Sequence, residues 1–268
     1  MTEPLLSARE GPFVVLTLND PERANPLSSA MAVALTAELE AAAEDSTVRA
    51  VIITGAGSNF SAGADLTALG QIAAGGDEGK AREDTEKLRR LFEVLLGHPK
   101  LTVAAVHGAA VAGGCGLATA CDLVIAEPVA RFAYPEVKIG FVAALVMTFL
   151  TRRVPGHVAR RMLLDPEMMS AERALELGLV DELVPEGAAM SRALALAHSV
   201  CSKASPAALA ATKALLNEIS GMDWMVGLGT AAEVNVRQRM HSDCVRGVRT
   251  FVDTKSTPDW LEEPEDNR

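Results

Sequence analysis

Apolar and polar residues alternate with two different spacings in the first half of the chain. Short and almost continuous apolar runs predict β-strands at 13–18, 48–54, 102–106, 122–126 and 130–133. The longer segments between them carry apolar residues three or four positions apart, which is the spacing of a helix with one buried face. Strands that alternate with helices in this way predict an α/β architecture.

The predicted helices have recognisable starts and faces. Ser28 can cap a helix that runs to about Ala43. A second helix is predicted over 81–96, and its apolar face is formed by Leu88, Leu91, Phe92 and Leu95. The glycine-rich stretch from Gly70 to Gly79 is expected to be mobile. Helical spacing dominates the second half, apart from one extended segment at 180–184, so that half is expected to be mainly helical.

The composition fits one large domain, or one main domain with a smaller appendage. The 268 residues are 49% hydrophobic and 22% charged, which excludes global disorder. A net charge of −10 argues against strong nucleic-acid binding, because phosphate contacts need a basic surface. An anionic ligand would therefore need a local basic patch.

The remaining bulk features predict a cytoplasmic protein without a metal centre. The four cysteines include no C-x-x-C pair and none at metal-ligand spacing with histidine, so we expect free thiols in a reducing compartment. The N-terminal residues resemble no signal peptide, and no stretch of about 18 apolar residues predicts a membrane span.

Two glycine-containing turns share one local pattern of apolar strand, turn and helix start. They lie at Phe60 to Leu66 and at Val111 to Leu117. Small residues let a ligand approach the backbone closely, and amides at a helix start lack intrahelical partners and carry partial positive charge. Two such turns on adjacent strands can direct two donors at one oxygen, as in an oxyanion hole. Either turn alone is equally compatible with tight helix–strand packing.

Other chemistries built on glycine loops do not match. Residues 55–60 lack the third glycine of a dinucleotide-binding fingerprint. The sequence contains neither a G-x-x-x-x-G-K-[ST] phosphate loop nor a G-x-S-x-G nucleophile elbow. His107 lies near the second turn, but no two histidines share metal-ligand spacing.

Several motifs, in order along the chain, resemble the crotonase superfamily, also called the enoyl-CoA hydratase/isomerase family. The resemblance extends from about Phe13 to Phe251. It is carried by Phe60-Ser61-Ala62-Gly63-Ala64-Asp65-Leu66, Gly108-Ala109-Ala110-Val111-Ala112-Gly113-Gly114-Cys115, Ala120-Cys121-Asp122-Leu123, Pro135-Glu136-Val137 and Gly178-Leu179-Val180-Asp181.

The resemblance implies a fold, an assembly and a ligand. The implied fold class is α/β, with a crotonase-like ββα spiral core over 1–200 and a helical C-terminal segment over 201–268 that serves trimerisation or covers the site. Trimers are implied, which in this family often pair into hexamers. The implied ligand is an acyl-CoA thioester, bound as substrate. No cofactor, metal, nucleic acid or membrane partner is expected.

The resemblance also implies site residues by position. The family's oxyanion donors correspond to the amides of Ala64 and Gly113. Its CoA-binding segment corresponds to 21–27, where Arg23 is a candidate phosphate ligand. Phe251 and Lys255 resemble the segment that reaches a neighbouring subunit's CoA site. The other implied substrate-binding or CoA-binding residues are Ala24, Ala62, Asp65, Leu66, Gly114 and Gly116.

The carboxylates depart from the pattern of the family's hydratases, which usually carry two active-site glutamates. Glu136 occupies the position in the Pro-Glu segment, but the position after the Gly-Gly-Cys run is Gly116. A lone glutamate beside an apolar acyl pocket is expected to have a raised pKa, which suits proton transfer. Asp65 is expected to cap a helix, and the stretch after Gly140 is more apolar than in many hydratases.

Three functions therefore stay open. Hydration of a 2-enoyl-CoA, in fatty-acid or branched acyl catabolism, is favoured by its prevalence in the family. A Δ3,Δ2-enoyl-CoA isomerase needs only one base, which Glu136 can supply. A non-catalytic acyl-CoA-binding paralogue would have lost one glutamate without gaining another reaction.

Overall fold

A six-stranded sheet forms the centre of the computed structural model, which describes residues 3–262. The strand order is β1-β2-β4-β6-β8-β11. β1 pairs antiparallel with β2, and the other neighbours are parallel. The strands are β1 (Leu5–Glu10), β2 (Phe13–Leu18), β4 (Ala50–Gly55), β6 (Leu101–Val106), β8 (Leu123–Ala126) and β11 (Glu182–Leu183).

Two smaller sheets carry the turns that were singled out from the sequence. After β4 the chain forms β5 (Gly63–Ala64), which pairs with β3 (Pro26–Leu27). After β6 it forms β7 (Ala109–Val111), which pairs with β9 (Arg131–Ala133), and β9 also pairs with β10 (Met169–Ser170). Along the chain, β4 and β5 are followed by a helix, and so are β6 and β7, which is the expected ββα repeat.

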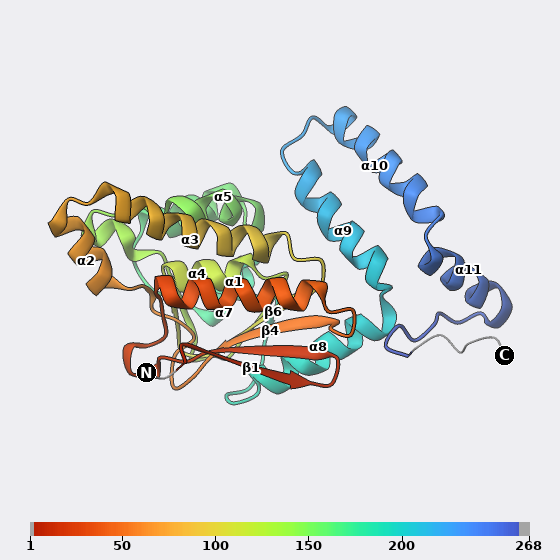
Figure 1. Ribbon diagram of the computed structural model, residues 1–268, viewed down its shortest axis with the longest axis horizontal. Coiled ribbons are helices and arrows are strands. Elements are labelled where there is room, and N and C mark those ends of the chain that lie inside the picture. Colours follow the sequence, from red (N-terminus) through yellow and green to blue (C-terminus); the bar gives the residue numbers. More distant parts are fainter. Residues whose placement is uncertain (1–2, 263–268) are drawn as a thin grey trace.

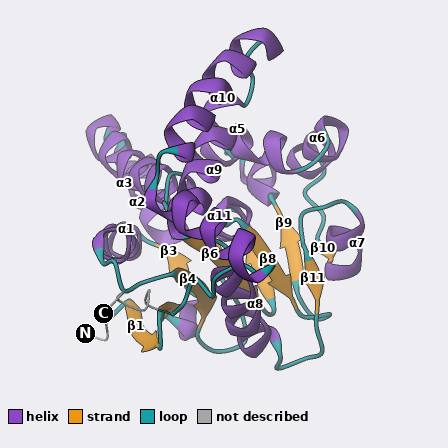
Figure 2. Cartoon of the chain, turned by 90° about the vertical axis from the view of Figure 1, so that its right-hand side faces the viewer, coloured by secondary structure: helices purple, strands orange, loops and turns teal. Residues whose placement is uncertain are grey.

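Helices cover both faces of the central sheet (Figure 2). α1 (Ser29–Glu44), α3 (Glu78–Leu96) and α4 (Gly113–Ala120) pack into the core on one face, and α8 (Ala189–Lys203) packs on the other. Because both faces are covered, the inner strands β4 and β6 are buried along their whole length and are mostly apolar. The other helices of the body are α2 (Leu66–Gly75), α5 (Ala144–Arg153), α6 (Gly156–Leu164) and α7 (Ala171–Glu176).

The last helices form an arm that extends from the body (Figure 1). The arm consists of α9 (Pro206–Ile219), α10 (Trp224–Arg239) and α11 (Ser242–Thr254). Polar contacts hold α9 to the body, because Lys213 Nζ lies 2.6 Å from the Asp122 carboxylate and Asn217 donates to the Leu96 carbonyl. In contrast, large apolar side chains of α10 and α11 are exposed, among them Trp224 and Phe251, and so is Met240 between the two helices.

Most predicted elements are confirmed, and two segments have structure that the sequence did not predict. Ser28 caps α1 as expected, accepting from the Met31 amide at 3.2 Å. No helix was predicted over Gly70–Gly79, yet α2 continues to Gly75 and α3 begins at Glu78, and the expected mobility of this stretch stays a prediction. Alanine and leucine at helical spacing outweigh the glycines there. β1 was not predicted, since only its first residue is buried and its edge position hides the alternation.

Neither a membrane-crossing helix nor a metal-binding cluster occurs within residues 3–262. No helix there is long and apolar enough to span a bilayer. No group of three or more histidine, cysteine, aspartate or glutamate side chains is arranged there to hold a metal ion.

Candidate active site

The first glycine turn is held against the second by contacts that leave no room for a side chain at Gly63. This residue has a φ of +85°, and a methyl group on it would lie 2.5 Å from the Val111 carbonyl oxygen and 2.7 Å from Ala112 Cβ. Backbone conformation and space therefore both require glycine. The Ser61 hydroxyl fixes the turn, because it accepts from the Gly63 amide at 3.2 Å and donates to the Asn25 carbonyl at 2.8 Å.

The second turn presents the first amide of α4. Ala112, just before the helix, has φ 51° and ψ −125°, a strained conformation for a residue with a Cβ. Its amide donates to the Ala133 carbonyl at 2.8 Å, and its carbonyl accepts from the Gly116 amide at 2.9 Å. The second bond holds the peptide that joins Ala112 to Gly113, and the first holds the peptide before it. The Gly113 amide, at the first helical position, has no acceptor within the helix.

The two amides predicted as oxyanion donors lie close together. A methyl group on Gly113 would lie 4.0 Å from the Ala64 backbone nitrogen, and one on Gly63 would lie 3.0 Å from the Gly113 nitrogen. Ala64 and Ala112 line the same cavity. The structure thus brings the amides of Ala64 and Gly113 to one place, and their role as donors stays a prediction.

Asn25 was not singled out from the sequence, yet it organises the segment that leads to the site. It is fully buried, and both Asn25 and Ala24 adopt left-handed conformations, with φ of 54° and 57°. The Asn25 side chain donates to the carbonyls of Ala56 and Asn59, both at 2.8 Å. The Ala24 carbonyl accepts from the Ala62 amide at 2.7 Å. The Asn-Pro pair at 25–26 was the available signal for such a turn.

Arg23 is tied to two carboxylates beside the cavity. Its guanidinium lies 3.0 Å from Asp65 and also pairs with Asp20. Asp65 caps α2, as expected, by accepting from the amides of Thr67 and Ala68 at 3.0 and 3.2 Å. Burial alone would raise the pKa of Asp65, but the Ala68 amide and the Arg23 guanidinium lower it overall. The Arg23 guanidinium is therefore already paired with two carboxylates.

Glu136 is the buried carboxylate of the same cavity. It follows Pro135 in a 3-10 turn over Pro135–Ile139, and it is 9% exposed. The Glu136 carbonyl accepts from the Phe141 amide at 3.0 Å, whereas Oε2 has no hydrogen-bond partner among residues 3–262. Burial raises the pKa of Glu136, although its own backbone amide acts in the opposite direction. A carboxyl with a raised pKa suits acid–base chemistry near neutral pH.

The cavity that joins these groups has a volume of about 520 Å³. Much of its wall is apolar, and Ile139 and Phe141 contribute exposed side chains to it. Such a cavity, with a few polar groups directed into it, is typical of small-molecule sites. Of the predicted site residues, it is lined by Arg23, Ala62, Ala64, Asp65, Leu66 and Glu136.

Gly114 and Gly116 are not among the residues that line this cavity. A methyl group on Gly114 would lie 2.5 Å from the Ser61 carbonyl oxygen, so this position serves close packing of the two turns. A methyl group on Gly116 would lie 2.4 Å from Val146 Cγ1 and 3.3 Å from the Phe92 ring. Val146 of α5 is 4% exposed, and it fills the space into which a side chain at 116 would project.

Phe251 and Lys255 lie away from the cavity of their own chain. In Figure 1, α11 and α2 stand at opposite ends of the molecule. The Phe251 side chain is 52% exposed, and Lys255 ends α11 in a left-handed conformation. Their predicted role in CoA binding therefore requires a neighbouring copy of the chain.

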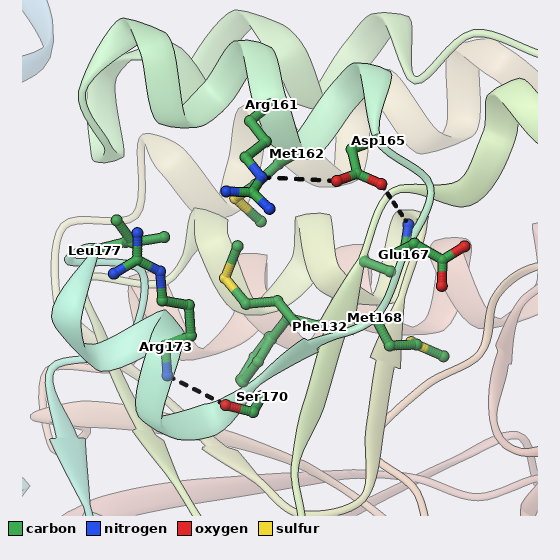
Figure 3. Close-up of a pocket in the computed structure, with 11 residues that line it drawn as sticks. Phe132, Arg161, Met162, Asp165, Glu167, Met168, Ser170, Arg173 and Leu177 are labelled. Atoms are coloured by element: carbon green, nitrogen blue, oxygen red, sulfur yellow. Dashed lines mark hydrogen bonds and ion pairs between the residues drawn. The ribbon is translucent and has the colours of Figure 1, made fainter.

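A second concave site, shown in Figure 3, lacks the features of the first. It encloses about 210 Å³ between α6 and α7. Its charged groups are already paired, Arg161 with Asp165 and Arg173 with Glu176. The start of α7 is capped, because Ser170 accepts from the Arg173 amide. The larger cavity is therefore the candidate active site.

Known proteins resemble this chain over nearly its whole length. The family model for enoyl-CoA hydratase/isomerase matches residues 9–263. A Thermus thermophilus protein, provisionally named as an enoyl-CoA hydratase, is 45% identical over 94% of this chain and 98% of its own. The 2,3-dehydroadipyl-CoA hydratase of Escherichia coli is 34% identical over 96% of this chain and 98% of its own.

A solved structure is similar to this chain in fold as well as in sequence. The crystal structure of an enoyl-CoA hydratase from Mycobacterium smegmatis superposes with a TM-score of 0.89 and 32% identity. The match covers 97% of this chain and 99% of the other. The expected α/β spiral fold is confirmed by this likeness.

Proposed function

The chain belongs to the enoyl-CoA hydratase/isomerase family, and on that premise we propose that it stabilises the enolate of an acyl-CoA thioester and moves a proton to or from it. The amides of Ala64 and Gly113 receive the thioester oxygen, and Glu136 acts as acid and base. One observation carries the proposal: a buried carboxyl with a raised pKa and an unpartnered oxygen lines the same cavity as the glycine turn.

The developing charge explains why two fixed amides matter. When a bond forms at Cβ or a proton leaves Cα, an electron pair moves onto the thioester oxygen. Donors that are already in place stabilise this charge without reorganisation. The Gly113 amide belongs to a peptide whose carbonyl oxygen, that of Ala112, accepts from the Gly116 amide, and the preceding peptide is held because the Ala112 amide donates to the Ala133 carbonyl. Loss of one such donor typically lowers the rate by about 10²–10³-fold.

Hydration of a 2-enoyl-CoA is the reaction that we propose. The water oxygen bonds to Cβ, the double-bond electrons pass to the thioester oxygen, and a proton is delivered to Cα as the carbonyl re-forms. Glu136 alone can take the proton from water and supply one to Cα, so its own charge is restored at the end. The names of the Thermus thermophilus and Escherichia coli relatives support hydration.

Isomerisation of a 3-enoyl-CoA to a 2-enoyl-CoA is the second candidate, and Val146 favours it. One base suffices for this reaction, because Glu136 can remove the Cα proton and return a proton at Cγ of the resulting dienolate. Val146 occupies the space beside Gly116, so the second carboxylate position is filled by a methyl group. A reaction with a single carboxylate fits that arrangement.

Parallel assays of crotonyl-CoA hydration and 3-enoyl-CoA isomerisation test both candidates. Glu136→Gln should lower the rate of the true reaction by about 10²–10⁴-fold, the usual effect of losing a general acid–base group. Glu127→Gln is the matched control, because Glu127 is also buried and accepts from the Ala189 amide at 3.2 Å. A glutamine oxygen can still accept this bond, so the control variant should turn over normally.

The outcomes separate the candidates. Hydration that survives Glu136→Gln would refute the role of Glu136. Failure to exchange the α-proton of a thioester with D₂O would exclude isomerisation. Tight CoA binding without either reaction would refute both enzymatic proposals and leave an acyl-CoA-binding protein.

A further inference from the structure

The single tyrosine of the chain lies two residues before Glu136 in the sequence. Tyr134 is 1% exposed and is separated from Glu136 only by Pro135. Its hydroxyl lies 3.0 Å from Thr119 Oγ1, which lies 2.7 Å from the Cys115 carbonyl oxygen. A carbonyl oxygen can only accept, so Thr119 donates to Cys115. Tyr134 therefore donates to Thr119, and the direction of both bonds is fixed.

These bonds tie the turn that carries Glu136 to the helix that carries Gly113. Thr119 lies near the end of α4, whereas Gly113 is its first residue. At the other end of the helix, the Ala112 amide donates to the Ala133 carbonyl at 2.8 Å. Ala133 and Tyr134 are consecutive, so the segment that leads into the turn is attached to α4 at both ends of the helix.

Glu136 depends on indirect support of this kind. Its Oε2 atom has no hydrogen-bond partner among residues 3–262, so the backbone of the turn sets where the carboxylate stands. On the C-terminal side, the Phe141 amide donates to the Glu136 carbonyl. On the N-terminal side, the ring of Pro135 restricts the backbone, and Tyr134 supplies a buried side-chain anchor.

We propose that Tyr134, acting through Thr119, is a positioning residue that sets the place of the Glu136 carboxylate relative to the Gly113 amide. Tyr134 does not line the cavity, and its hydroxyl is bonded to α4, so it acts on the reaction only through the turn. Burial holds the pKa of Tyr134 well above its usual value, so the hydroxyl keeps its proton and stays a donor. The inference rests on the proposed roles of Glu136 and Gly113.

Two single variants and their combination test the link. Tyr134→Phe and Thr119→Val each break the same bond, so each should lower kcat about 10-fold with little change in KM, as a misplaced catalytic group does. Thr119→Val also removes the Thr119 bond to the Cys115 carbonyl. The double variant should be no slower than Thr119→Val, because Tyr134→Phe then removes only a bond that Thr119→Val has already broken. Thr119→Ser keeps the hydroxyl and should retain most of the wild-type kcat. Thermal unfolding of every variant shows whether folded protein is being compared.

Thr54→Val is the matched control for a lost buried hydroxyl. Thr54 donates to the Ala105 carbonyl at 2.9 Å in the central sheet and does not line the candidate active site. Thr54→Val should leave kcat unchanged. Wild-type kcat in Tyr134→Phe, or a loss in Tyr134→Phe that Thr119→Val does not share, would overturn the proposal.

Direct titration of Glu136 reports on the environment of its carboxylate and does not require the protein to catalyse a reaction. Carbon-13 NMR of labelled glutamate side chains reports the pKa, and Glu136→Gln assigns the signal. Because burial raises this pKa, loosening the turn in Tyr134→Phe or Thr119→Val should lower it, whereas Thr54→Val should not. The other charged groups of the cavity, Arg23, Asp65 and Lys138, are the same in all these variants. If the wild type catalyses neither reaction, the proposed function fails, and the titration still decides the positioning role.

Discussion

The buried carboxyl of Glu136 makes stability depend on pH. Burial raises its pKa, so the folded state favours the protonated form. Its contribution to stability is therefore complete below the ordinary glutamate pKa, about 4.3, and is lost as pH rises through the raised pKa of the folded state. Glutamine does not ionise, so Glu136→Gln removes this loss of stability at higher pH. It should stabilise the protein at mildly alkaline pH by on the order of 1 kcal/mol, because an unpartnered charge is costlier than a neutral amide.

Urea unfolding of wild type and Glu136→Gln over a pH series measures this difference. The two should converge at acid pH, where the wild-type carboxyl is protonated. A gap that is the same at every pH would contradict the account. Glu127→Gln, which keeps an acceptor for the Ala189 amide, serves as the control.

Gly116 and Val146 determine together whether a second carboxylate fits. Gly116→Glu alone should destabilise the protein by at least about 1–3 kcal/mol, the usual effect of overpacking a core, because its Cβ would lie 2.4 Å from Val146 Cγ1. Adding Val146→Ala removes that atom and should recover part of the loss. The double variant should also hydrate crotonyl-CoA faster than Val146→Ala alone. Equal rates would show that a carboxylate at 116 does not reach the bound water.

At the scale of elements, the sequence predicts a helix, strand or turn when the hydrophobic or turn pattern lies entirely within contiguous residues of that element. Phe13–Leu18 is apolar along its length and is confirmed as β2. The two glycine turns were recognisable for the same reason, because strand, turn and helix start are contiguous. The contact between Gly116 and Val146 was not predictable. It joins α4 to α5 through packing, and no local pattern records which side chain of one helix fills a space beside another.

A half-buried lysine contributes to the attachment of α9 to the body. Lys213 donates to the Lys100 carbonyl and to the Asp122 carboxylate, both at 2.6 Å. Lys213→Met keeps the length of the side chain but loses both bonds. It should lower the free energy of unfolding by about 2 kcal/mol, since hydrogen bonds to charged groups contribute roughly 1.5–3 kcal/mol.

Hydrogen exchange distinguishes a local effect from a global one. In Lys213→Met, amides of α9 should exchange faster, while those of β4 in the central sheet stay protected. Lys203→Met is a suitable control, because Lys203 bonds only at the exposed surface of α8 and such changes usually stay within about 0.5 kcal/mol. Unchanged exchange in α9 would show that Lys213 is not its anchor.

At the scale of the whole molecule, the arm exposes several large apolar side chains. Trp224 is 73% exposed and Met240 is 81% exposed, and Phe251 is also open to solvent. Contiguous exposed apolar side chains mark interaction surfaces. We therefore propose that the chain forms a homotrimer, or a pair of trimers, through the arm. That assembly would also bring Phe251 and Lys255 of one copy toward the cavity of another.

Light scattering of wild type and Met240→Glu tests the assembly. The wild type should have the mass of three or six chains, and the variant should dissociate, because a charge cannot be buried unpaired at an apolar interface. Leu164→Glu is the matched control, since Leu164 is 66% exposed but lies on α6 in the body. A monomeric wild type would refute the assembly. It would also remove the basis for a CoA-binding role of Phe251 and Lys255.

The packing of Val146 against Gly116 also constrains how the lineage can change. A glutamate introduced at 116 meets the valine, and a smaller residue at 146 leaves a void in the core, so each single substitution lowers stability. A second glutamate at 116 would therefore need both substitutions together or a more stable background. Such a pair acts as an evolutionary ratchet, and descendants of this chain are expected to diversify around one carboxylate.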